Sequence, residues 1–573
     1  MSEMTQAHAP ATHADWPLRP WLLAALLGIA GLCVHLFSDW NADNMPPWRA
    51  ALVAAFAFGP LALAFTVDRL RWKEPLVFAG LVALVMAGIA WRVTVAGDRH
   101  ADESFWLAAG LVAITLAMPL FQAGFHRLRW RTAYDQTHFH VWTDAISGAG
   151  ALVFTGVSWL LVVLLAALFS AIDIDIVENV VDEPWFGWTF SGAAFGAALG
   201  VLRNQLKIIG TLQSVVMLVF SIIAVPLAAA LAIFLLAVLA SGIAALWNAT
   251  ESPTPLLLSV AVAAFVLVNA VIRNADDEVS GNRALRWASL VLALAILPLA
   301  LLAAVSAGTR IAEYGLSPER LWGIVAVAVA VAYGVAYFAA PIRGRIAGWM
   351  ERVRRANMHL AVATCVLAFI LALPLFDFGA ISARNQIARL DAGEVAVDEF
   401  DFDALRWDFG DAGREALARL TDSNDPEIAK IARETQTQDS RPYRGYRDTN
   451  RDERLANIRF EFEDEALRDH VRGSVRGNGS YCDKPCVALD LGAGEDGRRK
   501  VAMVEGGDVR KLSFDLGEAV DDSPTGAVAM EAVLAVEAFE ATPDQTANSE
   551  VEIREWSGRR VYIDGQPAGD PFE

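Results

Sequence analysis

RGRIAGWMERVRRANMHLAVATCVLAFILALPLF, residues 343 to 376, sets the topology of this chain. Five arginines lie between positions 343 and 355, and the stretch from 358 to 376 contains no Asp, Glu, Lys or Arg. The bilayer core needs about 20 apolar residues per helix, and basic connectors stay on the cytoplasmic side. We therefore expect the chain to leave the cytoplasm here for the last time, so that everything after Phe376 lies beyond the membrane.

Ten further apolar stretches precede this one. A chain with 55% hydrophobic residues and a mean hydropathy of +0.37 is too apolar for one soluble globule. Of the 22 Lys and Arg in residues 1–380, 17 fall in alternate connectors and 5 in the rest, which fixes the sides. The first span is expected to serve as its own insertion signal. The eleven expected spans are 21–37, 51–66, 76–91, 104–121, 151–172, 186–202, 208–247, 256–272, 288–308, 323–342 and 358–376.

Two of these spans allow a second interpretation. Residues 208–247 form either one long helix bent at Pro226 or a tight hairpin, and residues 186–202 either cross fully or re-enter. A hairpin or a re-entrant segment would move the arginines of 343–355 outside, so we favour one helix and a full crossing. Gly196 and Gly200 have the small-xxx-small spacing that lets helix backbones approach closely.

The remaining residues, 381–573, differ in character. They carry 25 Lys and Arg against 42 Asp and Glu, a net charge of −17, whereas residues 1–380 carry 22 against 24. This acidic balance argues against a nucleic-acid partner. Helical spacing followed by alternating patterns predicts a soluble α+β domain, helices first and antiparallel strands second. The expected helices are 382–390, 398–420 and 426–437, and the expected strands are 487–491, 500–504, 509–516, 527–539, 551–556 and 560–563.

The expected organisation is thus a cytoplasmic segment (1–20), an α-helical polytopic membrane bundle of about eleven transmembrane helices (21–380) and an acidic extracytoplasmic α+β domain (381–573). We expect a multi-pass membrane protein with a cytoplasmic N-terminus and a C-terminal domain on the far side of the membrane.

Cys482 and Cys486 are the only cysteines of the acidic domain. In an oxidising compartment they predict a disulfide that closes a small loop. A metal site is the alternative, but zinc usually takes four ligands and His470 is the only histidine nearby in sequence. A redox pair would have two intervening residues rather than three. We therefore expect neither a metal nor a cofactor.

Two short motifs imitate ligand-binding loops. Residues 488–494 (ALDLGAG) resemble a nucleotide-cofactor glycine loop, but a strand rather than a helix follows, which favours a hairpin. Residues 448–459 open with calcium-loop spacing, but Glu453 replaces the required glycine and Arg459 the bidentate acid. A solvated loop is the better interpretation.

Polar side chains are scarce inside the expected spans, and none of the spans holds an acid or a base away from its ends. The intramembrane candidates are His35, Gln122, Gln213 and Asn269, which more often form helix-to-helix hydrogen bonds than bind substrate. His126, His138 and His140 share one basic connector, where a surface loop is a better interpretation than a metal site.

The segment that follows the last span resembles a known family. SARNQIARLDAG (382–393), FDFDALR (400–406) and GDAG (410–413) resemble the junction of an uncharacterised bacterial membrane family, domain of unknown function 4153. The resemblance implies many helices, an extracytoplasmic domain and an inner-membrane location. It supplies no activity and no catalytic residues.

These observations favour a non-enzymatic sensor, scaffold or assembly factor of the envelope. The lipid bilayer is one partner, and an envelope protein or lipid is the candidate partner of the C-terminal domain. A transporter or channel for a neutral or lipidic solute is the alternative, because eleven spans exceed what an anchor needs. A lipid-linked transferase is a second alternative, with its acid or base in the outside loop 173–183.

Overall fold

The structure is a computed structural model of the whole chain, in which two compact units, residues 1–437 and 438–573, are distinguished. It describes residues 16–38, 45–172, 174–242, 253–276, 278–279, 281–343, 348–438, 441, 451–477, 481–482, 484–494, 497–505, 508–516, 551–556, 558–563 and 566–572.

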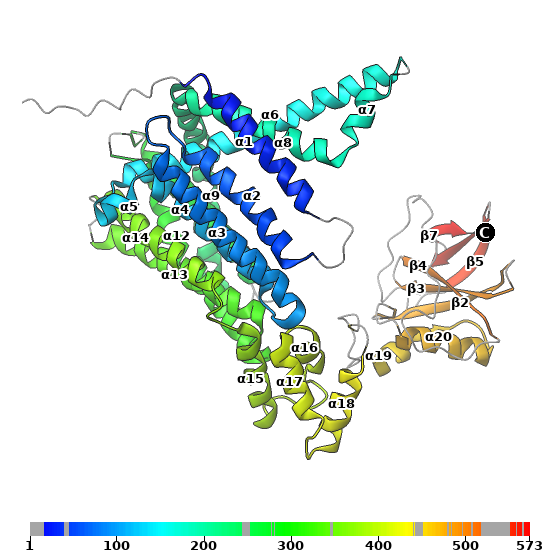
Figure 1. Cartoon of the computed structure of the whole chain (residues 1–573). Coiled ribbons are helices and arrows are strands. Elements are labelled where there is room, and N and C mark those ends of the chain that lie inside the picture. Colours follow the sequence, from blue (N-terminus) through cyan, green and yellow to red (C-terminus); the bar gives the residue numbers. More distant parts are fainter. Residues whose placement is uncertain are drawn as a thin grey trace, which may run out of the picture. The chain divides into compact units, whose positions relative to one another are not determined.

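Within these described residues, eleven helices of the first unit are long and apolar enough to cross a membrane, as the sequence predicts (Figure 1). Each overlaps one expected span, including the short segment 186–202. The eleven are α1 (Arg19–Phe37), α2 (Pro47–Thr66), α3 (Lys73–Ala96), α4 (Glu103–Gln122), α6 (Tyr134–Ser170), α8 (Pro184–Asn204), α9 (Leu206–Ser241), α11 (Pro253–Ile272), α12 (Arg283–Tyr314), α13 (Pro318–Arg343) and α14 (Trp349–Ala372).

The choice of one long helix over a hairpin is confirmed, since α9 is a single helix with Pro226 inside it. The expected start of α6 at position 151 is wrong, because the helix already begins at Tyr134. Hydropathy placed residues 134–150 on a connector because they are polar. Their polar side chains are partnered by neighbouring helices instead, as described below.

Glycines bring α1 and α8 into backbone contact along their length. A Cβ added at Gly196 would lie 2.2 Å from the carbonyl oxygen of Leu23, and one at Gly192 would lie 2.2 Å from that of Leu27. At Gly200 a Cβ would lie 2.5 Å from Cα of Pro20. The small-residue spacing read from the sequence therefore marks a real helix–helix contact.

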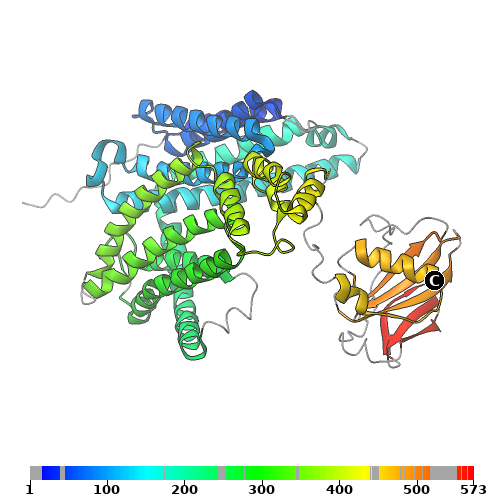
Figure 2. The same ribbon diagram turned by 90° about the horizontal axis from the view of Figure 1, so that it is seen from below.

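Four shorter helices follow the last span and belong to the same compact unit: α15 (Phe378–Asp391), α16 (Phe402–Trp407), α17 (Gly410–Leu420) and α18 (Pro426–Gln436). They gather at one end of the bundle around a core of their own that includes Phe400, Phe402 and Leu417 (Figures 1 and 2). The compact unit thus extends beyond the hydropathy boundary at residue 380. The expected helix 398–420 is divided in two, and Gly410, with φ of +63°, begins the second part.

The second unit contains α19 (Arg451–Ala456), α20 (Glu465–Gly477) and two sheets. One sheet has the order β1-β2-β3-β4 and the other β5-β6-β7. β1 runs parallel to β2 and every other pair is antiparallel. The strands are β1 (Ile458–Phe460), β2 (Cys486–Ala493), β3 (Arg499–Glu505), β4 (Asp508–Phe514), β5 (Val551–Trp556), β6 (Gly558–Ile563) and β7 (Gln566–Phe572).

β2 is buried on both faces, because alternate side chains enter different cores. Val487 and Leu489 pack with Val561 of the second sheet, whereas Ala488 packs with Leu467 of α20. The hairpin interpretation of 488–494 is confirmed by the antiparallel pairing of β2 with β3.

The helix α20 was not predicted from the sequence, although Leu467, Val471 and Val475 repeat at the four-residue spacing of an amphipathic helix and are all buried. The expected strand 527–539 lies outside the described residues.

Candidate functional site

Four side chains from four helices form a buried hydrogen-bond network inside the bundle. Asn269 of α11 donates from Nδ2 to the hydroxyl oxygen of Tyr337 on α13 at 2.7 Å, and that hydroxyl donates to Oδ1 of Asn357 on α14 at 2.8 Å. Nδ2 of Asn357 donates to Oδ1 of Asn269 at 2.8 Å, which closes a ring. The hydroxyl of Tyr134 on α6 adds a donor to Oδ1 of Asn269 at 3.3 Å.

All four residues lie near the basic connectors. Tyr134 begins α6, Asn269 is in the last turn of α11, Tyr337 lies two turns before the end of α13 and Asn357 lies in the third turn of α14. In each helix, the remaining residues toward the other end are mostly apolar. The network therefore occupies one end of the membrane region, where it joins four helices that are distant in sequence.

Arg354, one turn before Asn357, closes the end of α11. Its Nη2 donates to the carbonyl oxygen of Ile272 at 2.6 Å and its Nε to that of Arg273 at 3.2 Å. Its Nη1 pairs with Oδ1 of Asp276 at 2.7 Å. The last carbonyls of a helix have no partner within the helix and carry partial negative charge. A buried guanidinium there supplies both hydrogen-bond donors and a compensating positive charge.

His138 extends the polar cluster along α6. Nε1 of Trp142 donates to Nε2 of His138 at 3.0 Å, so the proton of a neutral ring resides on Nδ1, which donates to Oδ1 of Asn274 at 2.6 Å. The expectation that His138 lies on a surface loop is wrong, because the residue is helical and 6% exposed. His140 is helical too, and His126 in α5 (Phe125–Leu128) lies 3.5 Å from Oε2 of Glu74. Among the described residues, no group of His, Cys, Asp and Glu could hold a metal ion.

Gln122 belongs to a second polar cluster between α2, α4, α6 and α8. It donates from Nε2 to the carbonyl oxygen of Phe65 at 2.8 Å, and Arg203 donates to that of Ala64. Both Gln122 and Arg203 interact with the carboxylate of Asp144 in the third turn of α6. Asp144 thus adds an acidic side chain in the third turn of a bundle helix, in the part of α6 that precedes the expected span 151–172. Asp144 was not among the predicted residues because hydropathy assigned it to the connector.

The other two intramembrane candidates join neither cluster. His35 lies in the last turn of α1, and its Nδ1 is buried without a hydrogen-bond partner in the described part of the chain. Gln213 of α9 is buried, 5% exposed. Of the four predicted residues, Asn269 belongs to the ring and Gln122 to the second cluster.

At the other end of the bundle, the side chain of Asp102 connects α13 with α15, the first helix after the last span. The carboxylate is 1% exposed and accepts hydrogen bonds from Nε1 of Trp322 and from the backbone N–H of Phe378, both at 3.0 Å. Burial raises the pKa of the Asp102 carboxyl above its ordinary value, and these two hydrogen bonds oppose the shift. Asp102 was not among the predicted residues, since its partners lie 220 and 276 positions further along the chain.

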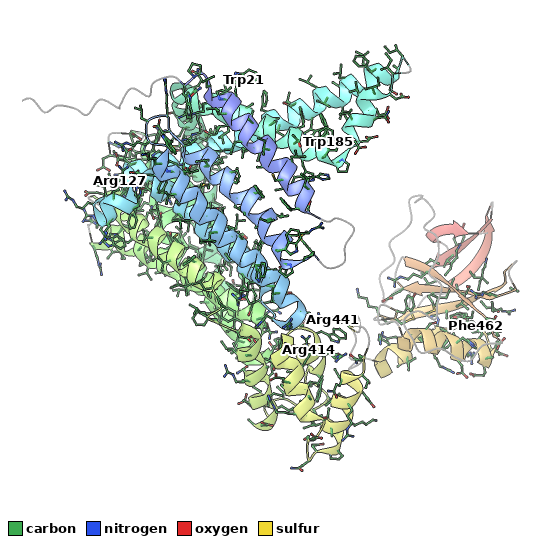
Figure 3. All side chains as sticks on the ribbon, in the orientation of Figure 1. Trp21, Arg127, Trp185, Arg414, Arg441 and Phe462 are labelled. Atoms are coloured by element: carbon green, nitrogen blue, oxygen red, sulfur yellow. A yellow bond between two sulfur atoms is a disulfide. The ribbon has the colours of Figure 1, made fainter. Side chains whose placement is uncertain are left out.

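Further polar contacts join the same elements. Oδ1 of Asn385 accepts from the backbone N–H of Leu316 at 2.8 Å, and Nη2 of Arg414 donates to the carbonyl oxygen of Asp98 at 3.0 Å. A Cβ on Gly410 would lie 2.2 Å from the carbonyl oxygen of Arg99, so the two backbone segments are in direct contact. Figure 3 shows Arg414 and Arg127 at opposite ends of the first unit. We call residues 378–436 the collar.

In the second unit, Cys482 and Cys486 form a disulfide, with sulfur atoms 2.00 Å apart. Glu505 organises the loop: its carboxylate accepts from the backbone N–H groups of Cys482 at 3.3 Å and Lys484 at 3.1 Å. Asn457 donates to the carbonyl oxygen of Cys482 at 3.1 Å. Residues 448–450 of the calcium-like motif lie outside the described residues. The expectation of a solvated loop is wrong for the rest of the motif, because residues 451–456 form α19 and β1 begins at Ile458.

Comparison with known proteins gives a family without an activity. No curated protein and no solved structure matches the chain. The family described as Domain of unknown function (DUF4153) matches residues 22–420, a range that covers the bundle from the first turn of α1 onward, together with α15, α16 and α17. The matched range includes both polar clusters and Asp102, and it ends with α17 before the second unit begins. The chain therefore belongs to the family of the domain of unknown function 4153.

Proposed function

We propose that this multi-pass membrane protein is a non-enzymatic sensor, scaffold or assembly factor of the bacterial inner membrane, with a periplasmic partner-binding unit. The observation that carries the proposal is the collar. Asp102, Asn385 and Arg414 attach it to the bundle through contacts between backbone and side chain. Residues 378–436 then act as a stiff extension of the membrane helices, to which the C-terminal unit is joined along the chain.

The proposed orientation is supported by which connectors share an end of the bundle. The collar contacts residues 98 and 99 and residues 314–316, and both segments are connectors that the charge bias assigns to the outside. The arginine-rich connectors lie at the ends of the same helices opposite to the collar. This agrees with basic connectors being retained in the cytoplasm.

The proposed absence of transport rests on the closed ring. Asn269, Tyr337 and Asn357 satisfy one another, and such fully connected polar groups lock helices together. A solute path requires polar groups that exchange protein partners for the solute. We therefore assign the ring to holding four helices in register.

Two parallel assays on the full-length chain test the proposal. A photoreactive residue is placed at Glu463 or Asp469, both exposed in the second unit, and for comparison at exposed Lys430 of α18. We expect a discrete adduct in intact cells from the second unit and none from α18. In proteoliposomes, passage of neutral solutes or lipid that Asn357→Leu abolishes, together with no adduct, would instead establish the transporter alternative.

A further inference from the structure

A cavity of about 410 Å³ opens at the basic end of the bundle, apart from the ring and the collar. It lies between the first turns of α12 and α14 and the connector that follows α11. Six of its lining residues matter here: Asp276, Arg283, Arg286, Trp287, Gly348 and Trp349.

The cavity has an excess of positive charge. The guanidinium groups of Arg283 and Arg286 have no hydrogen-bond or ion-pair partner in the part of the chain that the structure describes. Asp276, the one acid of the described lining, is already paired with Arg354 at 2.7 Å. Two arginine charges therefore face the cavity without compensation from the described residues.

Both arginines lie where the helix dipole opposes them. They occupy the first turn of α12, whose N-terminus carries partial positive charge, and this turn contains no acid. α14 begins at Trp349 after Gly348 and has no side-chain cap, so its first N–H groups lack partners within the helix. Asn282 caps the N-terminus of α12, whereas the uncapped N-terminus of α14 and the two guanidiniums meet at one cavity and favour a bound anion.

The position of the cavity narrows the class of anion. Trp287 is 60% exposed beside Arg286, at the end of a membrane-crossing helix. Indoles concentrate at the level of lipid head groups, and basic pockets between helices there bind phosphate-bearing head groups. Phosphate also suits the planar fork of arginine, which donates two parallel hydrogen bonds.

We propose that this cavity binds an anionic phosphate group, presented by a phospholipid head group of the adjoining leaflet or supplied as soluble phosphate. Arg283 and Arg286 hold the phosphate oxygens, the N-terminus of α14 faces the same charge, and Trp287 packs along the lipid. This site is independent of the function proposed above.

The test uses the full-length chain and two charge-matched double variants. Arg283→Gln with Arg286→Gln removes two charges from the cavity. Arg69→Gln with Arg71→Gln removes two exposed charges from another basic connector. Phosphatidylglycerol retained in detergent is counted by native mass spectrometry. In phosphatidylcholine nanodiscs, inorganic phosphate is tested for raising the midpoint of thermal unfolding.

For a lipid source we expect phosphatidylglycerol binding to fall by about tenfold or more in the cavity variant only, since charge-assisted hydrogen bonds are the strong ones. Inorganic phosphate would then have no effect. A phosphate-induced rise in the midpoint that the cavity variant loses identifies the soluble source. Equal lipid retention in all proteins together with no phosphate-induced rise in the midpoint, or equal loss in both double variants, overturns the site. Replacing both cavity arginines by Lys controls for misfolding, because it keeps the charge and should restore part of the binding.

Discussion

Nδ2 of Asn357 on α14 lies 2.8 Å from Oδ1 of Asn269 on α11, and neither residue is more than 7% exposed. The two residues are 88 positions apart in the chain, so this contact forms only when the two helices pack. It is the direct link between α11 and α14 in the ring.

The costs of replacing the two partners of this pair should not add. Asn357→Leu removes the acceptor of the Tyr337 hydroxyl and one donor to Oδ1 of Asn269, and we expect a loss of about 0.5–2 kcal/mol, the range for hydrogen bonds between membrane helices. Asn269→Leu removes the same bond between Asn357 and Asn269, so the double variant should be less unstable than the sum of the singles. Thermal unfolding in detergent gives the cycle. Strict additivity would show that the ring carries no coupling.

Arg354 should matter far more than its ion-pair partner. Asp276→Asn breaks an ion pair whose carboxylate is 68% exposed, so solvent screening limits the loss to about 1 kcal/mol or less. Arg354→Leu orphans the carbonyl oxygens of Ile272 and Arg273, each worth about 1–3 kcal/mol when left unsatisfied. Comparing the two unfolding midpoints tests this order. Equal effects would mean that the ion pair, rather than the helix end, is the important contact.

Asp102 predicts a pH dependence of stability with a definite sign. Because burial raises its pKa in the folded chain, the folded state binds the proton more tightly than the unfolded state. The contribution of Asp102 is therefore full below the unfolded value of about 4 and declines as the pH rises through the raised pKa. The midpoint difference between the wild type and Asp102→Asn should shrink or reverse over that window. A difference that grows with pH contradicts the assignment.

Gly410 and Gly393 form a matched pair for testing the collar. Both have positive φ, +63° and +70°, so alanine strains each by about 1–2 kcal/mol. A Cβ at Gly393 meets nothing within 4 Å, whereas one at Gly410 meets the backbone of Arg99. Gly410→Ala should therefore make residues 398–436 accessible to protease, and Gly393→Ala should not. Equal cleavage of the two variants would show that the collar is not held at this contact.

Thiol labelling in intact cells tests the side of the membrane and the disulfide together. In a chain carrying Cys33→Ser and Cys365→Ser, only Cys482 and Cys486 remain. An impermeant maleimide should label them only after reduction, because the disulfide blocks both thiols. Labelling that requires rupture of the inner membrane would place the second unit in the cytoplasm and reverse the proposed topology.

Hydropathy and charge were sufficient to predict the membrane crossings, because both properties are local. α9 is one helix with Pro226 inside it. The charge bias predicted this, because a hairpin at Pro226 would have moved the later basic connectors to the other side of the membrane. The start of α6 was misplaced because Tyr134, His138 and Asp144 are polar, and only tertiary partners make them compatible with a packed helix.

The polar sites could be predicted only in part. Asn269 stood out as an amide within an apolar run, but Tyr337 and Asn357 gained importance only from helices that meet through packing. Asp102 precedes the expected span 104–121, and no sequence feature distinguishes it from other acidic residues in the connectors. Long-range contacts of this kind leave no periodic signal in one sequence.

The glycine contact between α1 and α8 also bears on how the chain is assembled. α1 precedes α8 by five crossings, yet the backbone surface that receives it is formed by Gly192, Gly196 and Gly200 of α8. During synthesis from the N-terminus, this face of α1 can pack against α8 only after α2, α3, α4 and α6 have been made. The contact therefore forms no earlier than the sixth crossing of the described bundle.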